Sequence, residues 1–252
     1  MRVDKADWLD FAASLAPVSV DMLYVDPPFN TGKTQYTPTR AAAAKDRRGT
    51  TTRTTKYQDA WPTMPDYIAW LRARLTATLP AMKPSANLLI HCDWRASHHI
   101  RLLLDDLLGA DRFVNHLIWR YGLGGSSPRC FARKHDDILF YCINPALAYF
   151  QAPRIAATSR RLAGQTKKAT DVLDIPSLNN MSRERTGYPT QKPLALLDML
   201  IAACSPPAGL VIDPCCGSGT TLLAAHRQGR RFAGCDINPA AVAVARKRLA
   251  NT

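Results

Sequence analysis

The sequence lacks any apolar run of the roughly 20 residues that a helix needs to cross a bilayer. Its first ten residues include three acidic side chains, where a secretory signal peptide would carry a hydrophobic segment. These two absences exclude a membrane-spanning chain and argue against secretion. We therefore expect a cytoplasmic protein with no membrane partner.

Metal-binding cysteine pairs are also missing. The seven cysteines include no C-x-x-C pair, and the two that lie close together, Cys215 and Cys216, are adjacent. We interpret the cysteines as reduced, mostly buried residues. One short stretch does contain metal-ligating residue types, namely His91, Cys92, Asp93, His98 and His99. Because no second Cys/His pair completes a coordination shell, the sequence predicts no metal site.

Acidic residues are few relative to basic ones. The chain has 20 Asp and Glu against 33 Lys and Arg, which gives a formal net charge of +13. With 46% hydrophobic and 21% charged residues, the composition describes an ordinary globular core inside a basic surface. A chain of 252 residues can bury a full core, so a disordered tail and a disulfide-stabilised miniprotein are excluded. The positive charge predicts a polyanionic partner, nucleic acid first and an anionic membrane surface second.

Apolar runs of strand length alternate with segments of helical periodicity along most of the chain. This alternation predicts an α/β fold, a mostly parallel sheet with helices on both faces, in one domain over residues 1–252. Strands are expected at residues 22–25, 87–91, 114–120, 138–142, 210–212 and 231–235. Helices are expected at residues 64–82 and 100–108, from Pro193 onward, and after the Asn238-Pro239 cap.

Two basic segments interrupt this alternation. Residues 33–56 contain seven Lys and Arg against one Asp, so we expect residues 33–60 to form a basic loop that is mobile until a partner orders it. Residues 154–185 contain seven Lys and Arg against three acidic residues, and we expect residues 145–187 to form a small insert on the main sheet. The candidate nucleic-acid contacts in these segments are Lys33, Arg40, Lys45, Arg47, Arg48, Arg53, Arg160, Arg161, Lys167 and Lys168.

A glycine turn follows the expected strand at residues 210–212. Asp213 ends that strand, and Gly217 and Gly219 remove side chains where a ligand would touch the backbone. Asp236 ends the next strand, a position from which a carboxylate can accept hydrogen bonds from both ribose hydroxyls. Position 222 is Leu and no Gly-Lys-Ser/Thr follows, so the turn disfavours a diphosphate and favours another nucleotide-like cofactor. A tight turn with no ligand is the alternative interpretation.

A second motif, Asp26-Pro27-Pro28-Phe29, follows the expected strand at residues 22–25. The two prolines fix two φ angles and remove two N–H donors, so this strand end presents carbonyls, a carboxylate and an aromatic face in a rigid array. Such an array can accept both hydrogens of an amino group while a planar base stacks on Phe29. A proline-rich strand exit without a functional role is the alternative.

Together these motifs resemble the catalytic and cofactor motifs of the S-adenosylmethionine-dependent DNA amino-methyltransferases. Their order resembles the beta class of that family, and the resemblance covers most of the chain, including segments 88–93, 115–119, 133–139 and 188–193. One departure is Cys215, where the family usually has Phe. The resemblance implies a circularly permuted Rossmann-like sheet, in which residues 1–6 form the strand beside the last one. It also implies that residues 145–187 recognise the target.

The resemblance assigns roles to residues on both sides of the expected cleft. Asp7 would contact the adenine of S-adenosylmethionine, although it could equally cap a helix over residues 8–15. Lys192 would pair with the cofactor's carboxylate, although it could equally be a solvated charge. The implied catalytic residues are Asp26, Pro27, Pro28 and Phe29. The implied cofactor-binding residues are Asp7, Thr190, Lys192, Asp213, Cys215, Gly217, Gly219, Thr220, Asp236 and Asn238, with no metal.

The implied reaction is methyl transfer to the N6 of an adenine flipped out of double-stranded DNA. Family members with Asp before the prolines usually act on adenine, and those with Ser more often on cytosine N4, which stays the alternative. Cytosine C5 chemistry is disfavoured because Pro214-Cys215, the only Pro-Cys pair, lies inside the cofactor turn. An RNA or protein amide methyltransferase and a catalytically inactive DNA-binding module are further alternatives. A nucleoid location in a prokaryote, a homodimer and a cognate restriction endonuclease are compatible with the family.

Overall fold

The computed structural model describes residues 1–38, 53–122, 126, 128–157, 160–179 and 181–251, without the side chains of residues 33–38, 53–58 and 162. Its main sheet has eight strands. In spatial order they are β1 (Arg2–Lys5), β12 (Arg231–Asp236), β11 (Leu210–Asp213), β2 (Val20–Val25), β5 (Met82–Cys92), β7 (His135–Cys142), β6 (Phe113–Arg120) and β10 (Val172–Asp174). All neighbours pair in parallel except β7, which runs antiparallel to β5 and β6. The predicted α/β class and all six predicted strands are confirmed.

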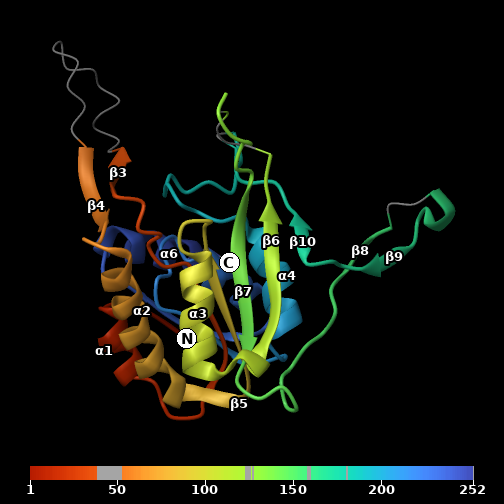
Figure 1. Ribbon diagram of the computed structural model, residues 1–252, viewed down its shortest axis with the longest axis horizontal. Coiled ribbons are helices and arrows are strands. Elements are labelled where there is room, and N and C mark those ends of the chain that lie inside the picture. The colour runs from red at the N-terminus through yellow and green to blue at the C-terminus, as the bar shows by residue number, and fades with distance from the viewer. Residues whose placement is uncertain (39–52, 123–125, 127, 158–159, 180, 252) are drawn as a thin grey trace.

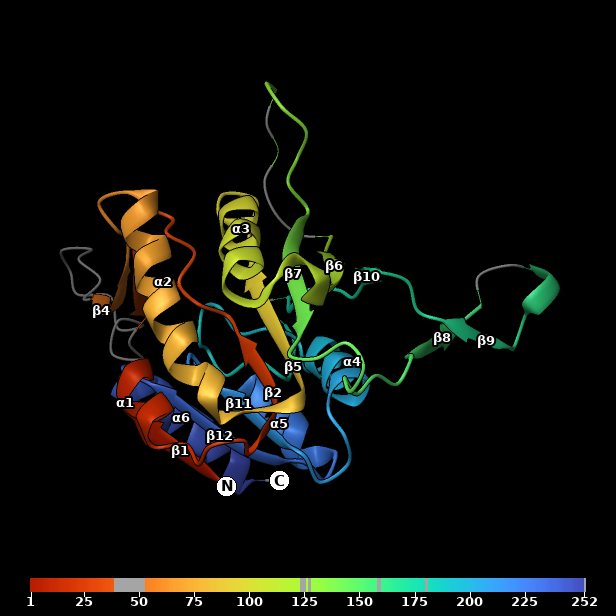
Figure 2. The ribbon, with the colours of Figure 1, turned by 60° about the horizontal axis from the view of Figure 1, so that its bottom comes forward.

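Helices cover both faces of this sheet (Figures 1 and 2). One face carries α1 (Trp8–Ala13), α2 (Met64–Thr78) and α3 (Ser97–Leu108), and the other carries α4 (Leu194–Cys204), α5 (Thr220–Arg227) and α6 (Pro239–Ala250). Strand β2 shows why, because Leu23 and Val25 pack into one core while Met22 and Tyr24 pack into the other. A parallel strand buried on both faces is apolar at every position rather than at alternate ones.

The N-terminal strand confirms the predicted permutation. β1 pairs with β12 in parallel, Val3 lying opposite Gly234 and Lys5 opposite Asp236. Helix α6, which follows β12 in the chain, begins as predicted, since the Asn238 side chain accepts a hydrogen bond from the Ala240 N–H at 2.9 Å. The first and last strands of the chain therefore lie side by side at one edge of the sheet.

One predicted helix is too long. Helical periodicity suggested a helix over residues 64–82, but α2 ends at Thr78 and a 3-10 turn over Leu79–Ala81 separates it from Met82, the first residue of β5. Pro80 explains the early end, because it has no backbone N–H to continue the helical hydrogen bonds and its ring collides with the carbonyl four residues earlier.

The basic segment at residues 33–60, which was predicted to be a loop, begins and ends in strands. β3 (Lys33–Pro38) pairs antiparallel with β4 (Arg53–Asp59) in a separate two-stranded ribbon. Threonine and tyrosine are frequent in both strands and favour extended backbone, a preference that the charge count did not reveal. Residues 39–52, including Arg40, Lys45, Arg47 and Arg48, lie outside the described residues. The predicted mobility of this segment stays a prediction.

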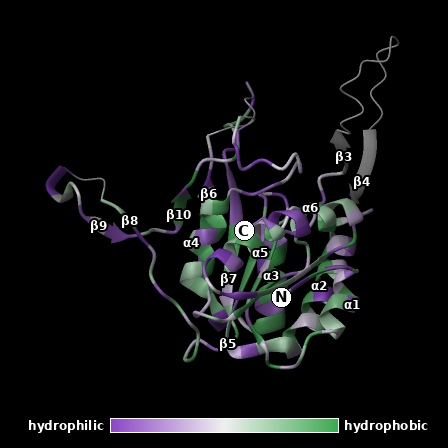
Figure 3. Cartoon of the chain, turned by 180° about the vertical axis from the view of Figure 1, so that it is seen from behind, coloured by the Kyte–Doolittle hydropathy of each residue, from purple (hydrophilic) through white to green (hydrophobic). Residues whose placement is uncertain are grey.

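The segment at residues 145–187 has two structural parts. β8 (Arg154–Ala156) and β9 (Thr166–Lys168) form a short antiparallel arm that stands away from the body (Figures 1 and 2). β10 then returns to the main sheet as its edge strand beside β6. The arm is largely hydrophilic, in contrast to the apolar central strands and helices (Figure 3). Within the described residues, no helix is both long and apolar enough to span a membrane.

Candidate active site

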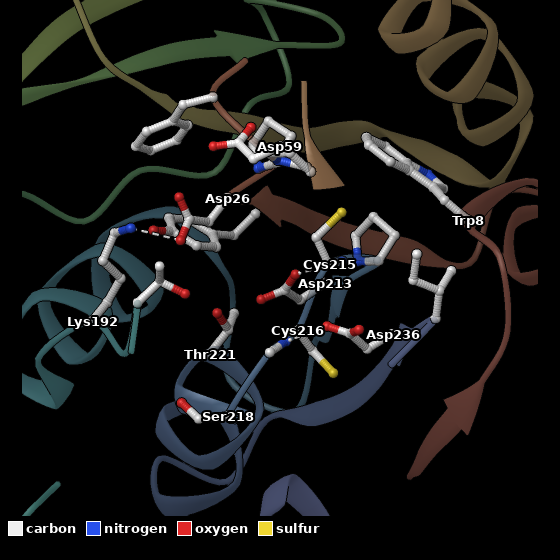
Figure 4. Close-up of a pocket in the computed structure, with 18 of the residues that line it drawn as sticks. Trp8, Asp26, Asp59, Lys192, Asp213, Cys215, Cys216, Ser218, Thr221 and Asp236 are labelled. Atoms are coloured by element: carbon white, nitrogen blue, oxygen red, sulfur yellow. Dashed lines mark hydrogen bonds and ion pairs between the residues drawn. The ribbon is translucent and has the colours of Figure 1, made fainter. Parts of the chain in front are cut away.

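A pocket lies where the carboxyl ends of β2, β11 and β12 meet at one edge of the sheet (Figure 4). Parallel strands bring their carboxyl ends to the same edge, and the strand-end motifs therefore share this pocket although they are far apart in the sequence. Residues from α1, α2 and the segment before α4 complete the lining. Both predicted motifs lie here, with Asp26 and Phe29 on one side and Asp213 and Asp236 on the other.

The Asp236 carboxylate at the end of β12 accepts hydrogen bonds from the backbone on both sides, including the glycine turn. The Gly217 N–H donates to Asp236 Oδ2 at 2.9 Å, and the Asn238 N–H donates to Asp236 Oδ1 at 2.8 Å. Gly217 has a φ of +51°, and a Cβ there would lie 3.2 Å from the Tyr188 ring. Glycine is thus required both by the backbone conformation and by the close aromatic neighbour. Asp236 fixes the turn in addition to facing the pocket.

Asp213 is an almost fully buried carboxyl group of the pocket, with 2% of its surface exposed. Its pKa is raised to about 7, mainly by burial and also by the negative charges of Asp26 and Asp236, against the lowering effect of hydrogen bonds from Thr221 and the Cys215 N–H. Burial and the neighbouring carboxylates both disfavour the ionised form of Asp213. The pocket by itself therefore does not fully stabilise its own negative charge. A bound cation would favour the ionised carboxylate.

The Asp26 carboxylate forms an ion pair with Lys192, whose Nζ lies 2.6 Å from Oδ2 (Figure 4). The same ammonium lies 5.2 Å from the centre of the Phe29 ring. Lys192 was expected to be either a partner of the cofactor's carboxylate or a solvated charge. With 13% of its side chain exposed, it is not a solvated charge, and in this structure it pairs with the catalytic-motif carboxylate, while its pairing with the cofactor stays a prediction. A contact across 166 residues leaves no trace in local sequence.

Phe29 rests on a buried histidine. The rings of Phe29 and His91 stack with centroids 5.9 Å apart and planes 21° apart. His91 is fully buried, and hydrogen bonds join its Nδ1 to Tyr24 Oη at 2.8 Å and its Nε2 to Asp136 Oδ2 at 3.2 Å. Burial alone would raise the pKa of Asp136, but the hydrogen bond and charge of His91, with a smaller effect of Lys192, hold it below its usual value.

This arrangement also bears on the metal-ligating residue types around His91. Both of its ring nitrogens have partners, so neither is available as a ligand without breaking a buried hydrogen bond. No group of three His, Cys, Asp or Glu side chains in the described part of the chain is arranged to hold a metal ion.

A second buried carboxylate, Asp59 at the end of β4, holds the other side of the catalytic loop. Its Oδ1 accepts the Asn30 N–H at 2.7 Å and its Oδ2 accepts the Thr31 hydroxyl at 2.5 Å. Asn30 has a φ of +55°, and its side chain accepts the Trp61 N–H at 2.8 Å. The loop after the prolines is therefore hydrogen-bonded to the end of β4, the second strand of the basic ribbon. Sequence reasoning missed Asp59 because it belongs to no motif.

The far wall of the pocket is aromatic. Asp7 both caps α1, accepting the Leu9 N–H at 2.8 Å, and forms an ion pair with Arg74 at 2.9 Å. The Arg74 guanidinium lies 4.3 Å from the Trp70 ring centre, one helical turn away on α2. Trp8 meets Trp70 edge to face at 6.2 Å. Asp7 therefore caps a helix, as one interpretation expected, and it also lines the pocket, while its contact with the cofactor's adenine stays a prediction.

The pocket contains most residues that sequence reasoning assigned to it. All four catalytic candidates line it, as do Asp7, Thr190, Lys192, Asp213, Cys215, Gly217, Thr220 and Asp236. Gly219 and Asn238 do not: a Cβ at Gly219 would lie 2.7 Å from the Ala245 Cβ, so this glycine permits helix packing, while Asn238 caps α6. The lining residues that sequence reasoning missed are Trp8, Tyr24, Thr31, Asp59, Trp61, Trp70, Arg74, Tyr188, Ser218, Thr221 and Ile237.

The predicted nucleic-acid contacts whose side chains the structure describes lie outside the pocket. Arg160, Arg161 and Lys168 are exposed on the β8–β9 arm, where Lys167 is half-buried. Lys33 and Arg53 belong to the two strands of the basic ribbon, and their side chains are not described. The arm and the ribbon project from different parts of the body (Figure 1).

Comparison with known proteins identifies similar enzymes. A family model described as DNA methylase matches residues 20–247. The type II methyltransferase M.ScaI of Streptomyces caespitosus is 32% identical over 151 residues, which are 54% of this chain and 50% of that protein. M.HpaI of Haemophilus parainfluenzae is 27% identical over 92% of this chain and 68% of its own length. The DNA adenine methyltransferase YhdJ of Escherichia coli K12 is 25% identical over 92% and 76%. The chain thus spans half the length of M.ScaI.

Two solved structures share the fold across nearly the whole chain. The M1.HpyAVI complex with SAM aligns with a TM-score of 0.65 at 21% identity, covering 98% of each chain. The cytosine-N4-specific PvuII DNA methyltransferase aligns with a TM-score of 0.71 at 15% identity, covering 98% of this chain and 85% of its own. At such identities the likeness concerns the fold alone.

We predict that Gly219→Ala destabilises the protein more than Gly229→Ala does. Both glycines have positive φ, +74° and +69°, so alanine costs about 1 kcal/mol of backbone strain at each. Only position 219 adds the clash with Ala245, because nothing lies within 4 Å of a Cβ at 229. Overpacking costs roughly 1–3 kcal/mol. Denaturant unfolding measures both variants, and equal losses would contradict the packing role.

Proposed function

The chain belongs to the N6/N4 DNA methylase family, and from this premise we propose that it transfers a methyl group from S-adenosylmethionine to the exocyclic N6 of an adenine flipped out of duplex DNA. The observation that carries the proposal is the convergence of Asp26-Pro27-Pro28-Phe29 and the Asp213 to Gly217 turn on one pocket. One motif suits an amino group and a planar base, and the other suits a nucleoside.

The pocket fits S-adenosylmethionine by charge and by shape. Sulfonium and ammonium groups are both cationic, and the pocket presents the carboxylates of Asp213 and Asp236, whereas the charge of Asp26 is offset by Lys192. Burial without sufficient compensation raises the pKa of Asp213 to about 7, which a cation nearby would reverse. Trp8 and Trp70 offer aromatic surface for a purine at the opposite end of the pocket. These features support cofactor binding between the glycine turn and the aromatic wall.

The catalytic loop supplies positioning rather than covalent chemistry. S-adenosylmethionine supplies the electrophilic methyl group when it is bound. An exocyclic amine is a poor nucleophile because its lone pair is delocalised into the ring. Hydrogen bonds from its two N–H groups to the Asp26 carboxylate and the Pro27 carbonyl favour a tetrahedral nitrogen whose lone pair can attack. Lys192 binds Asp26 Oδ2, so we assign Oδ1 to the substrate. That oxygen also lies where the proton released by the methylated nitrogen can be accepted.

Adenine is the acceptor that Asp26 favours, by the family pattern described above. The names of similar proteins point both ways, since YhdJ is a DNA adenine methyltransferase and the PvuII enzyme is cytosine-N4-specific. Cytosine N4 is therefore the second candidate, because its amino group presents the same two N–H donors. Duplex DNA as the partner is supported by the net charge of +13 and by the exposed cations of the β8–β9 arm.

We predict that the protein, expressed in a host without DNA methylation, places N6-methyladenine at one sequence context in genomic DNA. Nucleoside analysis with methylation-sensitive sequencing measures base and context together. Detection of N4-methylcytosine without N6-methyladenine would replace the adenine assignment by the cytosine one. Unmodified DNA together with purified protein that methylates no duplex would contradict the proposed function.

We predict that Asp26→Ala lowers methyl transfer by about 100-fold or more, because it removes a contact made to the developing charge on nitrogen. S-adenosylmethionine affinity should change little, since Asp26 acts on the amine. Single-turnover kinetics and calorimetry separate the two quantities. Loss of cofactor binding with an unchanged transfer rate would contradict the role of Asp26.

We predict that S-adenosylmethionine binds more tightly as the pH rises from 5.5 to 7. The pKa of Asp213 is raised to about 7, so the group is protonated at the lower pH and must lose a proton to attract the cation. Calorimetry in buffers of different ionisation enthalpy should show proton release near pH 6. Asp213→Asn, with folding confirmed by circular dichroism, should remove most of the dependence. An affinity that falls with rising pH would contradict this assignment.

A further inference from the structure

An exposed cluster of aromatic and cationic side chains lies just outside the pocket. Trp94, which follows the end of β5 by two residues, is 44% exposed. The guanidinium of Arg133 lies 4.0 Å from its ring centre and that of Arg95 lies 5.0 Å away. Arg95 is also paired with Asp93, which limits its freedom. Two cations against one exposed indole form a surface that is both charged and planar.

A second exposed aromatic side chain, Phe131, lies two residues before Arg133 in the sequence. It belongs to the loop between β6 and β7 that also carries Arg133, and 98% of it is exposed. A phenylalanine in water forgoes most of the free energy that its burial would supply, and nothing in the described residues explains this placement. We name Trp94, Arg95, Phe131 and Arg133 the Trp94 surface.

The Trp94 surface is joined to the base-stacking ring by a short chain of contacts. At the root of the β6–β7 loop, the Tyr121 N–H donates to Lys134 O at 2.9 Å, and the Tyr121 hydroxyl donates to Asp136 Oδ1 at 3.1 Å. Asp136 holds His91, and His91 stacks on Phe29. The loop leaves the sheet at the edge where β5 ends, because Cys92 pairs with Asp137 (Figure 1). Under the proposed function, a base on Phe29 is thus connected through buried contacts to the root of the loop that carries Phe131 and Arg133.

We propose that the Trp94 surface contacts the duplex beside the target base and that Phe131 enters the base stack at the position the flipped base leaves. This inference rests on the proposed function. Flipping costs stacking and pairing energy and opens a gap in the duplex. An apolar side chain inserted between base steps recovers part of that energy, while Arg95 and Arg133 neutralise the flanking phosphates. The net charge of +13 favours a polyanion over a second basic copy of the chain.

The test compares Phe131→Ala with Phe150→Ala on duplexes carrying the sequence context found in the genomic DNA. Phe150 is 56% exposed but lies near the amino end of β5, opposite the end that carries Trp94. The N–H of its neighbour Tyr149 donates a hydrogen bond to Ser85 O, near the start of β5. Phe131→Ala should lower kcat/KM about 10-fold or more, the scale of one lost stacking contact. Phe150→Ala should leave it unchanged. On a duplex whose target adenine faces an abasic site, the Phe131→Ala defect should shrink to less than threefold, because little flipping cost remains.

A second pair of variants tests the phosphate contacts. Arg95→Ala with Arg133→Ala should make the slope of log affinity against log salt shallower by about 1.8, from roughly 0.9 per contact. Arg227→Ala with Arg231→Ala is the control of equal charge change, because both residues are exposed and lie at the other edge of the sheet. An equal effect of the two pairs would overturn the contact.

Three further results would overturn the inference while leaving the proposed function intact. The first is wild-type kinetics in Phe131→Ala on matched DNA. The second is an equal defect on matched and abasic duplexes. The third is a change of oligomeric state in Phe131→Ala, measured by light scattering, that accounts for the lost activity. A wild-type protein that methylates no duplex would instead contradict the proposed function itself.

Discussion

The constraint on which the site depends is the convergence of three carboxylates. Parallel pairing brings the ends of β2, β11 and β12 to one edge, so Asp26, Asp213 and Asp236 share a pocket. Lys192 offsets the first and two backbone N–H groups bind the third. Asp213 is left with the least compensation, and its pKa rises to about 7. A chain with a net charge of +13 thus keeps an acidic pocket beneath a basic surface, which suits two ligands of opposite charge.

The catalytic loop is held from both sides by buried polar groups that lie outside its own motif. Asp59 binds Asn30 and Thr31 beyond the prolines, and His91 supports Phe29 from the neighbouring strand. Because every one of these contacts is buried or half-buried, the loop is positioned before any substrate arrives. Preorganisation of this kind lowers the reorganisation needed during the reaction. It also connects the loop to the β3–β4 ribbon through Asp59 and to the β6–β7 loop through Asp136.

Local sequence signals predicted the fold and about half of the pocket. The six predicted strands and the two motifs each depend on neighbouring residues, so a single sequence reveals them, whereas the permutation was implied by the family resemblance. The aromatic wall of the pocket was not predicted from the sequence, because Trp70 and Arg74 lie on a helix whose apolar spacing predicts core packing. The ion pair between Lys192 and Asp26 spans 166 residues, and no spacing rule reaches that far. Gly219 illustrates the opposite error, since a glycine beside a ligand turn and a glycine under a helix look identical in sequence.

His91 and Lys192, which both lie near the Phe29 ring, differ in how firmly they are held. Both His91 and the Lys192 ammonium lie against the Phe29 ring, so a base that stacks there must share the ring with one of them. His91 is fixed at both nitrogens, whereas Lys192 has a long flexible side chain held by one ion pair. Under the proposed function, a base that stacks on Phe29 therefore moves the Lys192 ammonium away from the ring, while the ammonium keeps its ion pair with Asp26 Oδ2 and leaves Oδ1 to the amino group of the base.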